Sequence, residues 1–450
     1  MRIRRIVFWV VLALAGGALV VWAFVLAREN KDADALDALL AEQAAAGHGT
    51  TVADFLAQHA AGDPTQLAAF RAWGQREEPA GIEARDSREQ ERAYLEHGGA
   101  MPENVAAYHR GWAPHARALE ALLDDGLASV SSPVWWHRHV DEHGMPTLAQ
   151  SLGHIETAPV WRLLDVVHWY VLHALYLDAA VGLRGLDRMP SLLRPFGSTL
   201  DHALSTAMAA IRDRCYLLLA WRGRLPADAR ARWVAEPPPR PEDLASAIDG
   251  TRLTLGIPLA RALAEGSTAA ADTIFLGGPS GFLERLDWQA YLFFDAAAEA
   301  REVVARQATI ADVLRGRRTP EALRTALPVE PEGGQIIRAE VASMRFMLHR
   351  QLMQRATHRL VRLAVTLMAG GGAPSAEALA GGPGDHALVY EDLGAGGHRL
   401  GVRAVAAPPA LFPPWNPPLP VNGGRRGKPL LPGAFATHEG SVEWGPPPVR

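Results

Sequence analysis

Apolar residues recur at three- and four-residue spacing along most of the chain, a pattern typical of amphipathic α-helices. Short breaks rich in proline and glycine separate the predicted helices, which cover 102–124, 146–156, 158–181, 197–222, 240–265, 283–307 and 334–369. Pro114 and Pro258 lie inside two of these segments and should kink or split them. Strand-type alternation is scarce over the same region, so we expect an all-α body.

The helix predicted over 158–181 is apolar enough to raise the alternative of a membrane span. However, Arg162, Asp165 and His173 fall on one side of its helical wheel, and each ionised group at the bilayer centre costs about 3 kcal/mol. We therefore interpret it as the buried central helix of the body. Because no repeat of fixed spacing is visible, the body is predicted to be an irregular helical bundle or a set of α-solenoid-like helical hairpins.

The pattern changes after Gly370. Alternating apolar residues on either side of Gly394–Gly397 predict a small β-hairpin near 387–405. Residues 407–450 are rich in proline and glycine, which predicts a flexible or polyproline-like tail.

A run of uncharged residues extends from Ile6 to Ala27, long enough to cross a hydrocarbon core of about 30 Å. Arg2, Arg4 and Arg5 precede it, and the positive-inside rule then places the N-terminus in the cytoplasm. This predicts a single-pass protein of the bacterial inner membrane, anchored in the lipid bilayer through residues 6–27, with an extracytoplasmic body. The alternative is a cleaved signal peptide, whose apolar core is shorter, about 7–15 residues.

These patterns divide the chain into five parts. They are a transmembrane signal anchor (1–29), membrane-proximal helices and a linker (30–100), the helical body (101–370), a small β-hairpin segment (371–406) and the flexible tail (407–450).

Composition narrows the function classes. A formal net charge of -4 over 450 residues excludes a broadly basic nucleic-acid binder. Cys215 is the only cysteine, which excludes an intrachain disulfide and any zinc or iron–sulfur site built on cysteines. Nearly all basic residues are arginine, with lysine only at Lys31 and Lys428. This bias fits GC-rich coding, so arginine-rich stretches carry less weight.

The densest cluster of candidate ligands is His137, His139 and His143, with Asp141 and Glu142 between them. Imidazole and carboxylate groups at this density are suited to zinc. A helix would place His139 and His143 on one face, whereas a strand would pair His137 with His139. The alternative is a surface loop or helix end. No other cofactor is predicted.

Three further features have structural explanations that we favour over catalysis. Asp165 and His168 are three residues apart and are expected to form a satisfied core pair. Cys215, although flanked by arginines, is expected to be a buried thiol. Gly277–Gly281 lacks the lysine and hydroxyl residue of a phosphate-binding loop and is expected to be a turn between helices.

The amphipathic helix predicted over 335–368 carries a basic face. The basic residues are Arg338, Arg345, His349, Arg350, Arg355, His358, Arg359 and Arg362. Such a helix can bind an anionic partner, either lipid or an acidic protein. The alternative, which we favour, is a helix that packs on its neighbours while arginine stems cover apolar surface.

Three parts of the chain carry a family resemblance: the segment Leu36–Phe55 after the apolar run, the helical region Trp161–Ile211, and His358–Leu367 followed by the predicted hairpin. They resemble single-pass, mostly helical envelope proteins of bacteria with GC-rich genomes, and the last part resembles the C-terminal end of pseudopilins. The chain departs from pseudopilins because it lacks their Asp-Pro-Phe turn and their N-terminal peptidase site. The resemblance implies no site residues.

These observations together predict a membrane-tethered, extracytoplasmic helical scaffold or adaptor that holds protein partners and is not an enzyme. Two alternatives stay open. One is a metal-dependent hydrolase built on His137, His139 and His143, and the other is an envelope assembly component related to pseudopilin-type systems.

Overall fold

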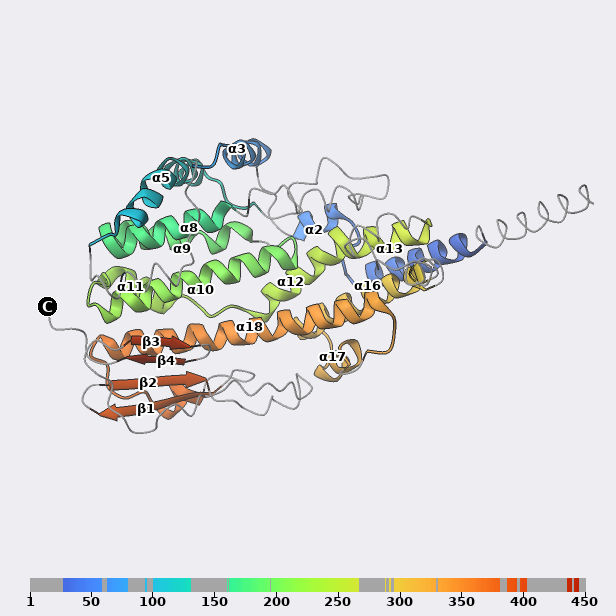
Figure 1. Ribbon diagram of the computed structural model, residues 1–450. Coiled ribbons are helices and arrows are strands. Elements are labelled where there is room, and N and C mark those ends of the chain that lie inside the picture. Colours follow the sequence, from blue (N-terminus) through green and yellow to red (C-terminus); the bar gives the residue numbers. More distant parts are fainter. Residues whose placement is uncertain are drawn as a thin grey trace, which may run out of the picture.

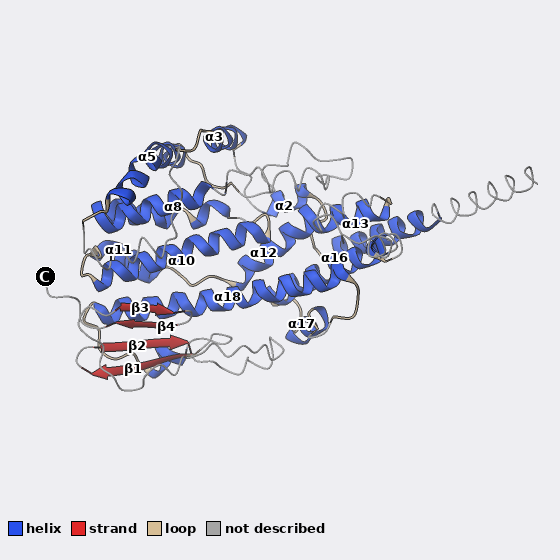
Figure 2. Ribbon diagram, in the orientation of Figure 1, coloured by secondary structure: helices blue, strands red, loops and turns tan. Residues whose placement is uncertain are grey.

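The computed structural model describes the chain in segments: 27–58, 63–79, 94, 100–130, 160, 162–194, 196–266, 288, 291–292, 295–328, 331–380, 387–394, 397–402, 435–438 and 441–444. This part of the chain is mostly helical, with one small antiparallel sheet near the C-terminal end (Figures 1 and 2). The predicted all-α character of the body is therefore confirmed.

Besides a helix at 27–45, the described helices are α2 (Val52–Gln58), α3 (Pro64–Gly74), α5 (Glu103–Asp124), α8 (Arg162–Leu172), α9 (Ala179–Arg188), α10 (Thr199–Trp221), α11 (Ala227–Ala235), α12 (Pro241–Thr251), α13 (Ile257–Ala264), α16 (Ala296–Leu314), α17 (Pro320–Ala326), α18 (Gln335–Met368) and α19 (Ala376–Ala380). Three short segments have other helical geometries: the π-helical turns η2 (His173–Leu177) and η4 (Arg252–Gly256) and the 3-10 turn η3 (Pro190–Leu193).

The two internal prolines have different effects. The segment predicted as one helix over 240–265 is divided into α12, η4 and α13. Pro258 has no N–H to donate, and the turn before it is π-helical, with the Ile257 N–H bonded to the Arg252 carbonyl. Pro114, in contrast, lies within the continuous helix α5.

The segment predicted as one helix over 158–181 is also divided, because α9 begins after Asp178, whose carboxylate accepts a hydrogen bond from Val181 N–H. Gly185 lies inside α9, although the sequence left this position in the interval between the helices predicted over 158–181 and 197–222. A Cβ at Gly185 would collide with the Tyr170 ring, and one at Gly182 would lie 2.5 Å from Ala174 N. These glycines therefore allow α9 to pack closely on α8 and η2.

Helix α10 lies at the centre of the helical body and packs against α8, α9, α12 and α18. Figure 1 shows α18 running along the molecule, with α10 on one side and the sheet on the other. Helices α12 and α13 pack on α16. Because helices far apart in the sequence pack directly, the arrangement is not a stack of neighbouring repeats.

The sheet has four antiparallel strands in the order β1-β2-β4-β3, namely β1 (Leu388–Gly394), β2 (Gly397–Val402), β4 (Ser441–Trp444) and β3 (Phe435–His438). Strands β1 and β2 form the predicted hairpin. Strands β3 and β4 lie within the segment 407–450 that we predicted to be a flexible tail, so that prediction is wrong for these residues. Val442 and Trp444 are buried, and β4 packs on α18.

The prediction of a single-pass inner-membrane protein is also corrected. Among the helices that the structure describes, none combines the length and apolar character needed to cross a bilayer. The long helices α5, α10 and α18 all carry charged residues along their length. Residues 1–26, which contain nearly all of the predicted span, lie outside the described residues.

Candidate functional site

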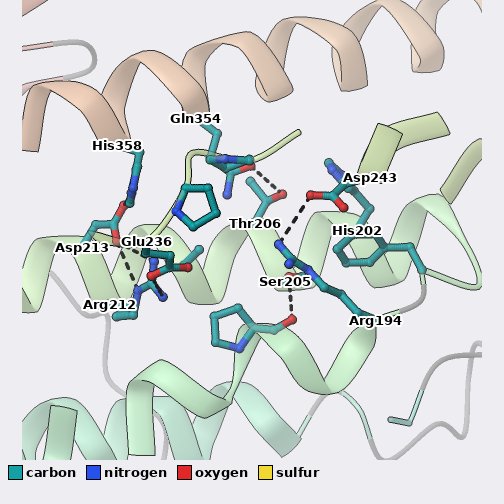
Figure 3. Close-up of a pocket in the computed structure, with 15 residues that line it drawn as sticks. Arg194, His202, Ser205, Thr206, Arg212, Asp213, Glu236, Asp243, Gln354 and His358 are labelled. Carbon is teal, nitrogen blue, oxygen red and sulfur yellow. Dashed lines mark hydrogen bonds and ion pairs between the residues drawn. The ribbon is translucent and has the colours of Figure 1, made fainter. Parts of the chain in front are cut away.

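A small pocket of about 40 Å³ lies between α10 and α18 (Figure 3). This volume has room for a few water molecules. We call it the α10–α18 pocket; its polar lining residues are Arg194, His202, Ser205, Thr206, Arg212, Asp213, Glu236, Asp243, Gln354 and His358. On each helix these residues recur at three- and four-residue spacing, which places them on one face.

One end of the pocket contains a buried pair formed by Asp213 and His358 (Figure 3). His358 is 2% exposed and Asp213 is 4% exposed. His358 Nδ1 lies 2.9 Å from Asp213 Oδ2, while Asp213 Oδ1 accepts from Trp233 Nε1 at 3.1 Å. Burial alone would raise the pKa of Asp213, but the charge of Arg212 and the hydrogen bond from His358 outweigh it and hold that pKa below its usual value.

The ionised Asp213 determines how His358 presents its ring. A carboxylate only accepts hydrogen bonds, so the proton lies on His358 Nδ1. In the neutral imidazole the other nitrogen, Nε2, is then an acceptor. His358 Nε2 is buried and has no hydrogen-bond partner within the described part of the chain. His358, which lines the pocket, therefore carries an unsatisfied ring nitrogen.

Arg212 connects α10 to the segment 236–240, which follows α11. Its Nε and Nη2 donate to Asp213 Oδ1 at 3.2 and 3.1 Å, and its Nη1 lies 2.8 Å from Glu236 Oε2. Burial alone would lower the pKa of Arg212, but Asp213 and Glu236 raise it. The guanidinium therefore stays charged, with each of its nitrogens directed at a carboxylate.

The segment 236–240, which we call the proline strap, is held by side chains of α18. Arg362 donates to the Glu236 carbonyl at 3.0 Å, Arg355 to the Pro239 carbonyl at 3.2 Å and Gln351 to the Arg240 carbonyl at 3.0 Å. Several basic residues of the predicted amphipathic helix thus bind the chain's own backbone, which agrees with the packing alternative that we favoured. An anionic partner for this helix stays a prediction.

The far end of the pocket contains His202 and two hydroxyl groups. Burial lowers the pKa of His202 to about 4, so this imidazole is neutral at pH 7. Ser205 Oγ donates to the Pro190 carbonyl at 2.8 Å, and Thr206 Oγ1 donates to Gln354 Oε1 at 3.1 Å. At the rim, Arg194 Nη2 lies 3.5 Å from Asp243 Oδ2.

Most candidates from the sequence lie elsewhere. His137, His139 and His143, like Gly277–Gly281, fall outside the described residues, so the metal-dependent hydrolase stays a prediction. Within the described segments, no group of three or more histidine, cysteine, aspartate or glutamate residues is placed to hold a metal ion.

Cys215 is a buried free thiol, as predicted. Tyr108 OH donates to the Asp165 carbonyl at 3.0 Å, and burial raises the pKa of the Asp165 side chain to about 6.

The sequence analysis missed the pairing of Asp213 with His358. The sequence analysis placed His358 in a basic face and did not single out Asp213. The available signal was a polar stripe along an otherwise apolar helix, from His202 to Asp213. Comparison of the chain with protein-family models, with curated proteins and with solved structures finds no match.

Proposed function

We propose that this protein binds a small polar molecule in the α10–α18 pocket, with His358 as its principal contact. The observation that carries the proposal is His358, which lines the pocket, whose Nδ1 is held by Asp213 and whose buried Nε2 has no hydrogen-bond partner among the described residues. Folded proteins give nearly every buried polar atom a partner, and an unsatisfied one costs about 1–3 kcal/mol. A ligand that donates to Nε2 would recover that free energy.

The test uses one variant that fills the pocket and one matched control. Ala209 lines the pocket, whereas its neighbour Ala210 is exposed on the same helix. Ala209→Met places a flexible side chain in the pocket without removing any polar group. Small amines, carboxylates and polyols are titrated by isothermal calorimetry. We expect at least one class to bind the wild type and the Ala210→Met variant but not the Ala209→Met variant.

Two outcomes would overturn the proposal. One is that no class binds the wild type. The other is that a class binds equally well to both variants, since the ligand would then occupy another place on the protein. Water would in that case be the occupant of the pocket, and the Asp213–His358 pair would serve only to join α10 and α18.

A second proposal is the helical scaffold or adaptor that the sequence predicts. It is supported by Phe346, which is 51% exposed on the first half of α18, with the Arg350 guanidinium 5.5 Å from its ring centre. Aromatic residues and arginine are the types that most often anchor protein interfaces. A photo-crosslinking residue at position 346 should then capture one predominant protein in cells, and Arg350→Glu should reduce that capture. A diffuse crosslinking pattern would count against a scaffold.

A further inference from the structure

We infer that the ligand of the α10–α18 pocket is a primary amine in its ammonium form, either a small one or the amino end of a larger molecule. This inference rests on the proposed function and names the chemical class of the ligand. Some hydrogen-bonding groups of the lining already bond to other protein atoms, and the groups that do not are the ones that a ligand can bind.

The hydroxyl groups of the lining can only accept further hydrogen bonds. Each hydroxyl has a single proton. Ser205 uses its proton on the Pro190 carbonyl, and Thr206 uses its proton on Gln354 Oε1. Both oxygens therefore offer only lone pairs to the pocket.

In its neutral form, with the proton on Nδ1 against Asp213, the His358 ring adds Nε2 as a third acceptor. Glu236 adds a carboxylate, which is 39% exposed and binds Arg212 through Oε2. Arg212 is the donor-rich residue of this wall, but its nitrogens are directed at Asp213 and Glu236. This side of the pocket thus presents acceptors to a ligand.

An ammonium group matches that arrangement, because it has three donors and no acceptor. The formal charges of the lining agree, with the carboxylates of Asp213, Glu236 and Asp243 against the guanidinium groups of Arg194 and Arg212. The neutral state of His202 at pH 7 removes one source of repulsion for a cation. A pocket of about 40 Å³ holds a group of only a few heavy atoms, such as a methylammonium ion, so a longer ligand would extend past the partly exposed Glu236 into solvent.

The experiment is a set of calorimetric titrations with methylammonium chloride, sodium acetate and glycerol at constant ionic strength. We expect methylammonium to bind and the other two not to bind. Glu236→Gln keeps an oxygen for Arg212 but removes the charge, and should weaken methylammonium binding about ten- to a hundredfold, the loss of one hydrogen bond to a charged group. Thr206→Val, which removes one acceptor at nearly constant shape, should weaken it about three- to tenfold.

The variants also separate this inference from the proposed function. If acetate or glycerol binds in place of methylammonium, and Ala209→Met abolishes that binding, the pocket is a ligand site but the amine assignment is wrong. If methylammonium binds but Glu236→Gln and Thr206→Val leave its affinity unchanged, the amine assignment is also wrong. If none of the three binds the wild type, the amine assignment fails. Failure of the wider panel of amines, carboxylates and polyols as well would overturn the proposed function itself.

Discussion

Two buried clusters in this molecule are built around a histidine that faces an aspartate. In the α10–α18 pocket, His358 lies 2.9 Å from Asp213. In the second, which we call the N-terminal cluster, His48 lies 3.1 Å from Asp312 of α16. The other members of the N-terminal cluster are Gln43, Asp249, Arg252 and Arg315.

The clusters differ in where their unsatisfied atoms point. In the N-terminal cluster, Asp249 Oδ1 has no hydrogen bond within the described segments, but it lies 3.4 Å from Arg252 Nε and 4.0 Å from His48 Nδ1. The unsatisfied atoms of this cluster are therefore close to one another: a carboxylate oxygen of Asp249 and the basic nitrogens of Arg252 and His48. In the pocket, the unsatisfied Nε2 belongs to His358, a residue that lines the cavity. The surroundings of the second histidine nitrogen are thus the difference between these two clusters.

The N-terminal cluster fastens the start of the described chain to the helical body. Arg252 is 0% exposed and donates to Gln43 Oε1 and to the Gly49 carbonyl, each at 2.6 Å. Arg315 adds an ion pair of 2.5 Å to Asp249 Oδ2. These contacts connect the helix at 27–45 and the turn after it to α12, η4 and α16.

The largest expected effect is the loss of Arg252 from the N-terminal cluster. Arg252→Met should lower the free energy of unfolding by about 3–5 kcal/mol, because it leaves Asp249 buried with fewer partners. Urea denaturation measures this. Asp249→Asn combined with Arg252→Met should be less costly than the sum of the two single variants, because the uncompensated charge is removed as well.

The matched control is Arg232→Met, which breaks an exposed ion pair with Asp228 on α11. It should change stability little. If Arg252→Met changes the free energy of unfolding as little as this control, the N-terminal cluster does not stabilise the attachment of the first described helix. The proposed structural role of that cluster would then be wrong.

Acid should lower the stability of the folded protein through His202, which lines the α10–α18 pocket. Its pKa is about 4 in the folded protein and about 6.5 when the chain is unfolded. Between these values the unfolded chain binds more protons, so stability falls as the pH falls from about 6.5 to about 4 and no further below that. The full contribution is about 3 kcal/mol.

Urea denaturation of the wild type and of His202→Gln at pH 7 and pH 4.5 measures this contribution. The wild type should lose more stability on acidification than the variant. An equal loss in the two proteins would show that His202 is not held neutral by burial.

Asp213→Asn should cost about 2 kcal/mol, less than the loss of Arg252, because asparagine can still accept from Trp233 and Arg212. In contrast to variants of the N-terminal cluster, it should also weaken ligand binding, since His358 loses the carboxylate that fixes its ring. Calorimetry with methylammonium measures the second effect. If Asp213→Asn destabilises the protein but leaves its affinity for methylammonium unchanged, the Asp213–His358 pair has only a structural role, like the His48–Asp312 pair.

Much of the helical fold could be predicted from the sequence, because amphipathic periodicity reports burial directly. The predicted segments 102–124, 197–222 and 334–369 agree with α5, α10 and α18 to within about two residues. Where the prediction failed, packing overrode the local signal: Gly185 lies inside α9, where the Tyr170 ring occupies the space that a Cβ would need. Strands β3 and β4 have four residues each, too few for alternation to be recognised.

The candidate site could not be predicted in the same way. Asp213 and His358 are 145 residues apart, and the pocket also needs Glu236 from the proline strap. Periodicity shows which face of a helix is polar, but not which other polar face it meets. His48 and His358 are each a lone histidine in the sequence, and only the packed structure shows that His48 lies between two carboxylates, whereas His358 contacts one carboxylate and lines a cavity.

The smallest expected effect concerns space. If the pocket is open, an added side chain should be tolerated there and resisted where two segments of the body are already in close contact. Ala209→Met should change the free energy of unfolding by less than about 1 kcal/mol, because its side chain enters the pocket. Gly250→Ala, next to Asp249, should cost about 1–3 kcal/mol, because its Cβ would collide with the Gly197 carbonyl and the backbone would have to move. Thermal and urea denaturation of the two variants measure the difference, and a costly Ala209→Met would mean that the pocket has no space for a ligand.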